Sequence, residues 1–327
     1  FVSALREDRA SLLFNDIMRS LILVLIAGAL IALFIKQKIN ATILISGITL
    51  ISAIDLMQFG SNYLNDKSFD NKDNYESNEF PLTTADKNIL DDKDPNFRVL
   101  NTASVEESHT SYYHKSIGGY HPAKLGIYDD LIAYQLNGRF NMSVINMLNT
   151  KYFIQQQGND KIAQLNPGAL GNVWYVKSVQ YVKGPGEEMR AISNFNPKDT
   201  AIVDESFKKE VGNYSQPDSN AIIKMTSFDN DAISYESNSS SSNIAIFSEI
   251  YYKDWKAYID GKQVSIFKAN YVLRGLNIPS GKHKIEFKFE PESFLIGKKI
   301  STASSWLLFL ILIGAIIKDL INRRKTI

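Results

Sequence analysis

Cysteine is absent from the 327-residue sequence, which excludes disulfides, thiolate metal sites and cysteine nucleophiles. A surplus of one charge is absent too, because 36 Lys and Arg residues nearly balance 35 Asp and Glu residues. Without a basic helix or an aromatic-studded basic strand, we expect no nucleic-acid partner. An extracytoplasmic domain without disulfides is common in bacteria and less common among eukaryotic secreted proteins.

Signatures of familiar catalytic machinery are also missing. The sequence contains no Ser-His-Asp order, no GxSxG elbow and no Walker loop, so neither nucleophilic hydrolysis nor phosphate-loop chemistry has support. His109, His114 and His121 suggest a metal site at first, but their spacing does not place paired ligands on one helical face. We therefore predict no metal ligands in this chain, and leave open whether the activity needs a divalent metal.

Three long uncharged runs dominate the hydropathy pattern: residues 20–35, 39–54 and 300–317. A helix rises ~1.5 Å per residue and needs about 20 mainly apolar residues to cross a bilayer, so with flanking residues each run is long enough to span. The alternative is that they are buried core helices of a soluble protein. The first two runs come as a pair and lack a cleavage pattern, which argues against a secretory signal.

The positions of Lys and Arg predict the topology, because cytoplasmic ends of spans are enriched in them. The tail after residue 317 and the loop at 36–38 are the basic ends, so both should be cytoplasmic. Residues 58–299 and the N-terminal stretch are then extracytoplasmic. Three arginines before the first run argue mildly against an extracytoplasmic N-terminal stretch, although acidic residues lie between them. Because the chain starts with Phe1, we expect it to be the C-terminal portion of a longer membrane protein.

Residues 58–172 divide into a polar linker and a small mixed segment. Residues 58–82 show no helical or alternating period, which predicts a linker. After it, Thr83 or Thr84 fits the cap of a short helix, and 96–101 alternates like a strand. Apolar residues recur at three- and four-residue steps from Leu125 to Leu136, which predicts a helix that starts at Pro122 with His121 as its N-cap.

From Val173 onward, short apolar strands alternate with turns. Predicted strands include 173–182 and 262–269, and Asp260-Gly261 is a strong signal for a type I′ hairpin. This spacing predicts an antiparallel β-sandwich. The predicted fold class is thus an α+β membrane protein with an extracytoplasmic small α/β segment and a β-sandwich. The predicted parts are a pre-span segment (1–19), two transmembrane helices (20–57), a linker (58–82), the α/β segment (83–172), the sandwich (173–292), a C-terminal transmembrane helix (300–321) and a cytoplasmic tail (322–327).

The stretch SYYHKSIGGYHPAKLGIYDDL, residues 111–131, gathers the candidate substrate-binding residues. Gly118-Gly119 before a helix start would expose backbone N–H groups, and flanking lysines would suit a phosphate such as that of a lipid-linked sugar. The alternative, which composition favours, is that the two glycines only allow a tight turn. Adjacent Asp129 and Asp130 lie about 100° apart on a helix and cannot both face one substrate atom. The candidates are His114, Lys115, Tyr120, His121, Lys124 and Asp129.

A second group of candidates lies in SEIYYKDWKAYIDG, residues 248–261. Tyr251, Tyr252 and Trp255 could stack on sugars at a rim, while a buried Trp in a sandwich core is the commoner alternative. Strict alternation predicts that Tyr252 and Trp255 lie on different faces.

Several stretches together resemble a known family, the YfhO-type bacterial membrane proteins, which are related to the GT-C glycosyltransferases. The resemblance covers most of the chain in order and is closest to Bacteroidetes members. The matching stretches are LREDRASLLFNDIMRSL, DLMQFGSNYLND, NFRVLN, TSYYHKSIGGYHPAKLGIYDDLI, INMLNTKYFI and SEIYYKDWKAYIDGKQVSIFKANYVLRGLNIPSGKHKIEFKFEPESF.

The resemblance implies a polytopic inner-membrane glycosyltransferase that takes sugar from a polyprenyl-phosphate donor and glycosylates an envelope polymer or lipid. Such enzymes carry the catalytic acidic residue in their first extracytoplasmic loop, so the resemblance assigns no catalytic residue to this chain. The implied partners are the bilayer, the lipid-linked sugar and the envelope acceptor. Two rivals remain: a non-catalytic envelope protein that binds glycans or assists assembly, and a transporter accessory subunit.

Overall fold

The computed structural model describes residues 2–105, 108–119, 121–138, 140–158 and 160–325. The chain forms two compact units, residues 1–81 and 82–327. Each unit is described by itself below.

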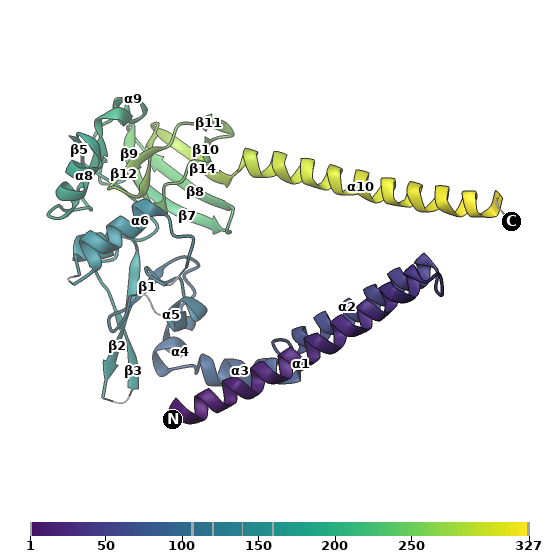
Figure 1. The fold of residues 1–327 in the computed structure, drawn as a ribbon. Helices are drawn as coiled ribbons and strands as arrows, with labels where there is room; N and C mark the ends of the chain where they lie inside the picture. The colour runs from purple at the N-terminus through teal and green to yellow at the C-terminus, as the bar shows by residue number, and fades with distance from the viewer. Residues whose placement is uncertain (1, 106–107, 120, 139, 159, 326–327) are drawn as a thin grey trace. The chain divides into compact units, whose positions relative to one another are not determined.

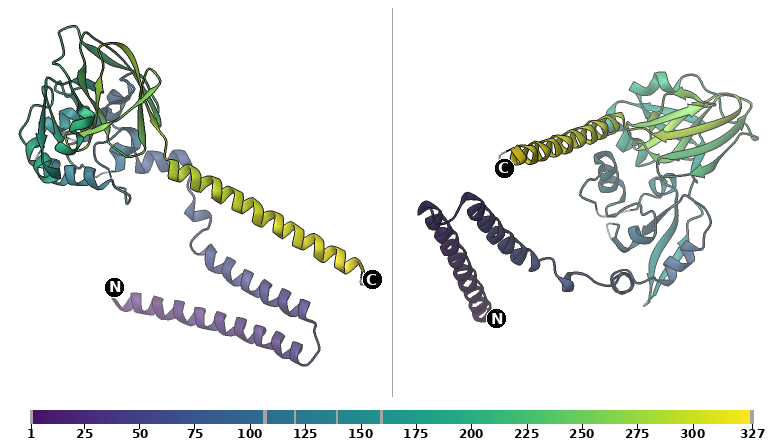
Figure 2. Two further views of the ribbon diagram at one scale, coloured as in Figure 1. Left: turned by 90° about the horizontal axis from the view of Figure 1, so that it is seen from above. Right: turned by 90° about the vertical axis from the view of Figure 1, so that its right-hand side faces the viewer.

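The first unit is a helical hairpin followed by two short helices. Figure 2 shows α1 and α2 running side by side in both views. Asn40 ends the reversal between them, since its side chain accepts a hydrogen bond from the backbone N–H of Ile43 at 2.9 Å. The elements are α1 (Val2–Ile35), α2 (Ala41–Ser61), the 3₁₀ helix η1 (Asp66–Ser68) and α3 (Lys72–Glu79).

An ion pair connects the two helices of the hairpin. Arg19 Nε lies 3.3 Å from Asp55 Oδ1, and Arg19 also pairs with Asp16 one turn earlier on α1. The two acidic partners neutralise Arg19, so this arginine says little about which side of the membrane the helix begins on. The pair also gives Asp55 a partner at the polar end of an apolar helix, where a lone charge would be costly.

The polar stretch after α2 contains a helix that the sequence pattern did not predict. α3 covers Lys72–Glu79 and begins at Asn71, whose side chain accepts a hydrogen bond from the N–H of Asp73 at 3.0 Å. The helix buries none of its residues, so no apolar period marks it. Capping, not packing, identifies it.

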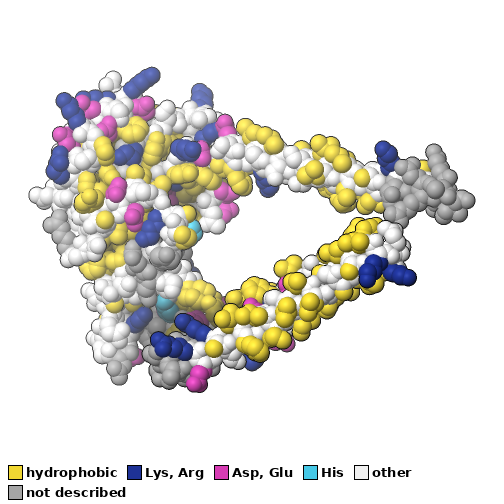
Figure 3. All heavy atoms as spheres, in the orientation of Figure 1, with side chains coloured by type: hydrophobic (Ala, Val, Ile, Leu, Met, Phe, Trp, Pro, Cys, Tyr) yellow, Lys and Arg dark blue, Asp and Glu magenta, His cyan; other side chains and the backbone are white. Residues whose placement is uncertain are grey.

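Among the described residues, three helices are long and apolar enough to cross a membrane: Arg9–Ile35, Ala41–Ser61 and Glu292–Lys318. The last of these lies in α10 (Glu292–Lys325). Hydrophobic side chains cover the surface of these helices in Figure 3, which a water-exposed helix would not show. The alternative of buried core helices is wrong, because none of the three spans is buried inside the protein.

The small α/β segment at the start of the second unit is built on a three-stranded sheet. Strand β1 pairs in parallel with β2, and β2 pairs antiparallel with β3. The predicted cap of the first helix is confirmed, since Thr83 and Asp86 form a capping box. The elements are α4 (Thr84–Leu90), β1 (Arg98–Asn101), α5 (Ser108–Tyr113), α6 (Gly126–Leu131), the π-helix η2 (Ile132–Leu136), α7 (Met142–Met147), β2 (Thr150–Gln157) and β3 (Asp160–Leu165).

The predicted helix start at Pro122 is wrong. Helix α6 begins at Gly126, because Leu125 is extended (φ −75°, ψ 116°) and its carbonyl accepts the first helical hydrogen bonds. His121 does not cap the helix; its Nδ1 accepts the N–H of Ala123 at 3.0 Å and forms a separate turn. The predicted apolar face is nevertheless used, since Leu136 is buried in the core and Tyr128 and Ile132 pack against it.

Two antiparallel sheets form the larger part of the second unit (Figure 1). One has the strand order β11-β10-β14-β8-β7 and the other β12-β13-β9-β4. Side chains from both sheets share one hydrophobic core, in which the rings of Tyr235, Phe247 and Phe287 meet edge to face. The strands are β4 (Val173–Tyr175), β7 (Ile222–Phe228), β8 (Ala232–Ser239), β9 (Asn243–Ile250), β10 (Trp255–Ile259), β11 (Lys262–Val264), β12 (Phe267–Ala269), β13 (Leu273–Ile278) and β14 (Gly281–Phe289).

The turn between β10 and β11 confirms the hairpin prediction, because Asp260 and Gly261 both have positive φ, at 50° and 79°. Two predicted strands are wrong in extent. The stretch 173–182 divides into β4 and β5 (Ser178–Val182). Between them, the backbone N–H of Lys177 donates to the Asp199 carbonyl. The stretch 262–269 divides into β11 and β12, which belong to different sheets.

A third layer covers the outer face of the four-stranded sheet. β5 and β6 pair in parallel, with α8 between them in the chain. Ile244 and Ile246 of β9 pack toward this layer, while Ala245 and Phe247 pack toward the other sheet. β9 is therefore buried on both faces. The layer comprises β5 (Ser178–Val182), α8 (Gly184–Ile192), β6 (Thr200–Asp204), η3 (Glu205–Phe207) and α9 (Lys208–Val211).

Candidate functional site

The two glycines in the candidate stretch are engaged in structure and do not present free donors. Gly118 donates its N–H to Ser116 Oγ at 3.1 Å, and Gly119 donates to the carbonyl of Val105 at 2.9 Å. A Cβ on Gly118 would lie 1.7 Å from that same carbonyl oxygen. Both N–H groups are therefore already hydrogen-bonded within the protein, as expected of a tight turn.

The side chains of His114 and Lys115 contact other parts of the second unit. The almost fully buried His114 side chain places Nε2 at 2.9 Å from Asp86 Oδ1, on helix α4. Burial raises the pKa of Asp86, but hydrogen bonds from His114 and Thr83 outweigh it and hold the pKa at about 2. His114 thus ties α4 to the segment that follows α5.

Lys115 contributes to a different part of the surface. Its Nζ donates to Asn96 Oδ1 at 2.9 Å and lies 3.5 Å from the centre of the Phe228 ring. Burial lowers the pKa of Lys115, and the Glu249 carboxylate opposes this shift. Lys115 therefore connects the α/β segment with the two sheets.

The remaining candidates of this stretch meet at one cavity, here called the loop cavity. His121, Lys124 and Asp129 line it, together with both glycines, and its volume is about 280 Å³. Lys124 Nζ pairs with Asp129 Oδ1 at 3.5 Å. Asp130 lies apart and accepts a hydrogen bond from the hydroxyl of Tyr271 at 3.1 Å. The predicted Tyr120 lies outside the described residues.

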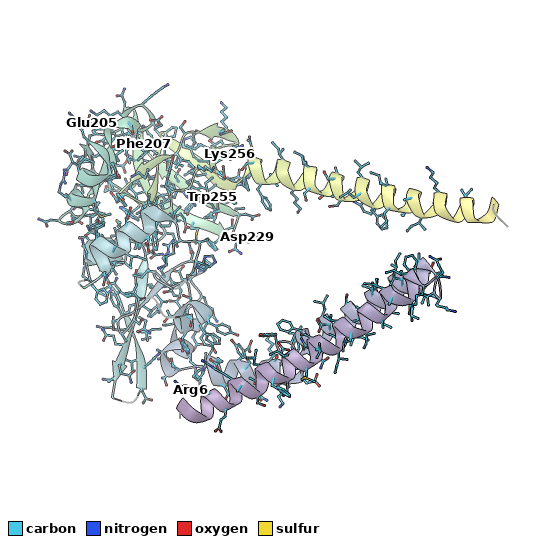
Figure 4. The ribbon with its side chains drawn as sticks, in the orientation of Figure 1. Arg6, Glu205, Phe207, Asp229, Trp255 and Lys256 are labelled. Atoms are coloured by element: carbon cyan, nitrogen blue, oxygen red, sulfur yellow. The ribbon has the colours of Figure 1, made fainter. Side chains whose placement is uncertain are left out.

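A second, larger cavity lies beside it and is here called the aromatic cavity. Its volume is about 560 Å³, and it shares Lys124 and Leu125 with the loop cavity. Tyr252 and Trp255 both line it, with ring centres 6.1 and 5.5 Å from that of Phe289. Figure 4 labels Trp255 at the start of β10, near the label of Asp229, which follows β7.

The prediction that Tyr252 and Trp255 lie on different faces is wrong. The chain makes a turn at 252–255, in which the backbone N–H of Trp255 donates to the Tyr252 carbonyl at 3.2 Å. The alternation of side chains along a strand therefore does not apply to these two residues. Tyr251 is the residue that faces elsewhere, with its ring 6.1 Å from that of Phe207. The buried tryptophan of the fold is Trp174, whose Nε1 donates to the Pro197 carbonyl.

The aromatic cavity contains two charged residues that the sequence pattern did not predict, Glu249 and Arg274. Arg274 is only 3% exposed, and its guanidinium carbon lies 3.9 Å from the centre of the Trp255 ring. Each interrupts an otherwise apolar strand, in NIAIFSEI and YVLRGLNI. A charge at such a position is the signal that could have identified them, because charged residues are rarely buried without a partner.

The buried charges form a network across the segment and the sheets. Glu249 Oε2 lies 3.7 Å from Arg98 Nη2, and Glu249 Oε1 accepts from Asn96 at 2.8 Å. Burial raises the pKa of Glu249, but Arg98 and the Asn96 hydrogen bond outweigh it and lower the pKa overall. Arg98 Nη1 also donates to the carbonyls of Leu148 and Ser248. Among the described residues, no group of three or more His, Cys, Asp or Glu side chains could hold a metal ion.

Comparison with known proteins finds one family model that matches part of the chain. The model of the family described as bacterial membrane protein YfhO matches residues 194–301. This range includes Tyr252, Trp255 and Arg274 and confirms the resemblance predicted from the sequence for this part of the chain. No curated protein and no solved structure matches the chain.

Proposed function

From the match to the YfhO family, we propose that this chain is the C-terminal portion of a polytopic membrane glycosyltransferase-like protein. It transfers a sugar from a polyprenyl-phosphate donor to an envelope polymer or lipid. In this proposal residues 58–299 are extracytoplasmic, the membrane is the bacterial inner membrane, and the relation is to the GT-C enzymes. The second unit positions the glycan, and the catalytic residue lies outside this chain.

One observation carries the proposal: two adjacent cavities share Lys124 and Leu125, and aromatic rings line the larger one. The combination of flat rings with a few polar groups is typical of sites that orient a sugar. A chain with three helices able to span a membrane would hold these cavities near lipid-linked substrates. The joined cavities thus suit the sugar and the linkage of one substrate.

The carboxylates in these cavities support a binding role more than a catalytic one. Glu249 is held by Arg98 and Asn96, and its lowered pKa makes it a poor proton acceptor near neutral pH. Asp129 is paired with Lys124. A second candidate function follows from the same observation: a non-catalytic envelope protein that binds glycans through the same cavities.

A transfer assay separates the two functions. The complete gene product would be reconstituted in vesicles that contain defined polyprenyl-phosphate sugars and an envelope acceptor. We expect transfer, and we expect His121→Ala and Tyr252→Ala to lower its rate at least tenfold without changing the melting temperature. The matched controls are His283→Ala and Tyr258→Ala, which change the same residue types elsewhere in the second unit. Binding of glycans without any transfer would contradict the enzymatic role and favour the second candidate.

A further inference from the structure

The surroundings of the aromatic cavity hold more positive than negative charge. Glu249 interacts electrostatically with Arg98, Lys115 and Arg274. Asp94, which forms an ion pair with Lys151, also acts on Lys115. Asn96 links two of these groups, because it donates to Glu249 and accepts from Lys115. Glu249 therefore faces three cations, and even with Asp94 near Lys115 an additional anion would be stabilised there.

Of these three cations, Arg274 has the fewest hydrogen-bond and ion-pair partners. Its Nε donates to the Ile250 carbonyl at 3.0 Å, but among the described residues its buried Nη1 has no hydrogen-bond partner. Burial lowers the pKa of Arg274 to about 10, which reflects the cost of desolvating the guanidinium. An unpaired donor on a buried charge is costly and calls for a specific reason. An incoming carboxylate or phosphate, which guanidinium groups bind with paired hydrogen bonds, would supply the missing acceptor.

The rings beside Arg274 define the rest of the ligand. Trp255 stacks on the guanidinium and stands next to Phe289, while Tyr252 is 41% exposed at the same cavity. Tyr252 can therefore present a free face to a sugar ring. The rings and the cation belong to one cavity, so they can contact different parts of a single molecule.

We propose that the aromatic cavity binds a saccharide that carries a carboxylate or a phosphate group. The anionic group lies on Arg274, and the sugar ring packs against Tyr252 and Trp255. This inference rests on the proposed function and deepens it, because it names the chemical class of the glycan. It also explains why a basic residue interrupts an otherwise apolar strand at this point.

Binding of small probes to the purified chain in lipid nanodiscs tests the proposal. Glucuronate, glucose 1-phosphate, glucose and inorganic phosphate would each be titrated by calorimetry. We expect at least one of the two anionic sugars to bind at least tenfold more tightly than either glucose or inorganic phosphate, and we expect added salt to weaken that binding. Preference for glucuronate would identify a carboxylate ligand, and preference for glucose 1-phosphate a phosphate ligand.

Variants test which residue binds the anionic group and which binds the sugar ring. Arg274→Gln should weaken binding of the anionic sugars at least tenfold, and Arg274→Lys should weaken it less because the charge remains. Tyr252→Ala changes an exposed ring and should reduce binding of the anionic sugars without affecting inorganic phosphate. Arg190→Gln, on the exposed face of α8, is the matched control and should bind like the unmodified chain.

Three outcomes would overturn the inference: no binding of either anionic sugar, equal binding of glucose, or unchanged binding in folded Arg274 and Tyr252 variants. If Arg274→Gln fails to fold, binding to the Arg274→Lys and Tyr252→Ala variants provides the test. The two proposals fail separately. Sugar transfer by a protein that binds no anionic sugar refutes only this inference, whereas anionic-sugar binding without transfer refutes only the enzymatic role.

Discussion

Single carboxylates organise several turns of this protein, and Asp86 is a fully buried example. It accepts hydrogen bonds from the N–H and the hydroxyl of Thr83 and faces His114. Asp260 plays a comparable part at the surface, where it accepts from Lys284 N–H and pairs with His283 Nδ1. At the scale of one residue, such groups connect pH to stability.

The His283–Asp260 pair predicts a pH dependence of the melting temperature. The carboxylate raises the pKa of His283 above its usual 6.5, and the imidazolium lowers that of Asp260. The contribution of His283 to the free energy of unfolding is therefore fully present below pH 6.5. It is lost as the pH rises through the pKa of His283 in the folded protein, which is higher than 6.5. The contribution of Asp260 is lost only as the pH falls below its usual 3.8.

Thermal unfolding of the Asp260→Asn variant across pH 5–9 checks this prediction. Asn-Gly keeps a residue pair suited to the type I′ turn, so the substitution removes mainly the charge. The variant should melt below the unmodified chain at pH 5, and the gap should close toward pH 9. A gap that is independent of pH would contradict a role for His283.

At the scale of elements, close backbone approach and capping define segments that hydrophobic periodicity misses. Helix α3 begins at a capping Asn71 and buries nothing, and the turn at Gly118 brings the backbone against Val105. The start of α6 moves to Gly126 because an extended Leu125 precedes it. Each of these features depends on backbone geometry, which leaves little trace in the pattern of apolar residues.

Gly118→Ala should be strongly destabilising. A Cβ there would lie 1.7 Å from a backbone oxygen, which no side-chain rearrangement can relieve. We expect a loss of about 2–4 kcal/mol in the free energy of unfolding. Gly126→Ala is the matched control, because nothing lies within 4 Å of its Cβ and it is in a helix. Equal effects of the two substitutions on the melting temperature would contradict this account.

The Arg19–Asp55 pair should stabilise the helical hairpin. Arg19→Leu removes the basic partner of Asp55, Asp55→Leu leaves Arg19 paired with Asp16, and the double variant lacks both charges of the interhelical pair. We expect a favourable coupling of about 0.6–1.7 kcal/mol, as for polar pairs between membrane helices. A double-mutant cycle in nanodiscs measures it, with Asp16→Leu as the control for the second carboxylate on Arg19. Additive effects of the two substitutions would mean that the pair contributes nothing.

At the scale of the whole molecule, patterning in the sequence predicts the spans and the strands but not the site. Uncharged runs and short alternating strands suffice for the three helices and the antiparallel sheets. The site depends on contacts between distant residues. Lys115 and Trp255 were predicted separately and prove to flank one charge network, because Asn96 and Glu249 join the segments that carry them. No local pattern contains that information.

The predicted topology is testable because the chain has no cysteine of its own. A membrane-impermeant maleimide applied to spheroplasts should label Ser219→Cys, which lies between the spans α2 and α10. It should label Gln37→Cys, in the loop between α1 and α2, only after permeabilisation. The unmodified chain is the control for background. Labelling of Gln37→Cys in intact spheroplasts would place the loop on the outside and reverse the assignment.

The order of elements along the chain places the aromatic cavity between the two points where membrane helices connect to the sheets and the α/β segment. Within the second unit, the strands and the α/β segment have two attachments: the chain enters them at Leu82, at the α/β segment, and α10 leaves them after β14, at the five-stranded sheet. The cavity takes residues from both parts, with Lys124 and Leu125 from the segment and Trp255 and Arg274 from the sheets. A force that pulls the two attachments apart therefore acts across the cavity, and a ligand that bridges its walls would bear part of the load.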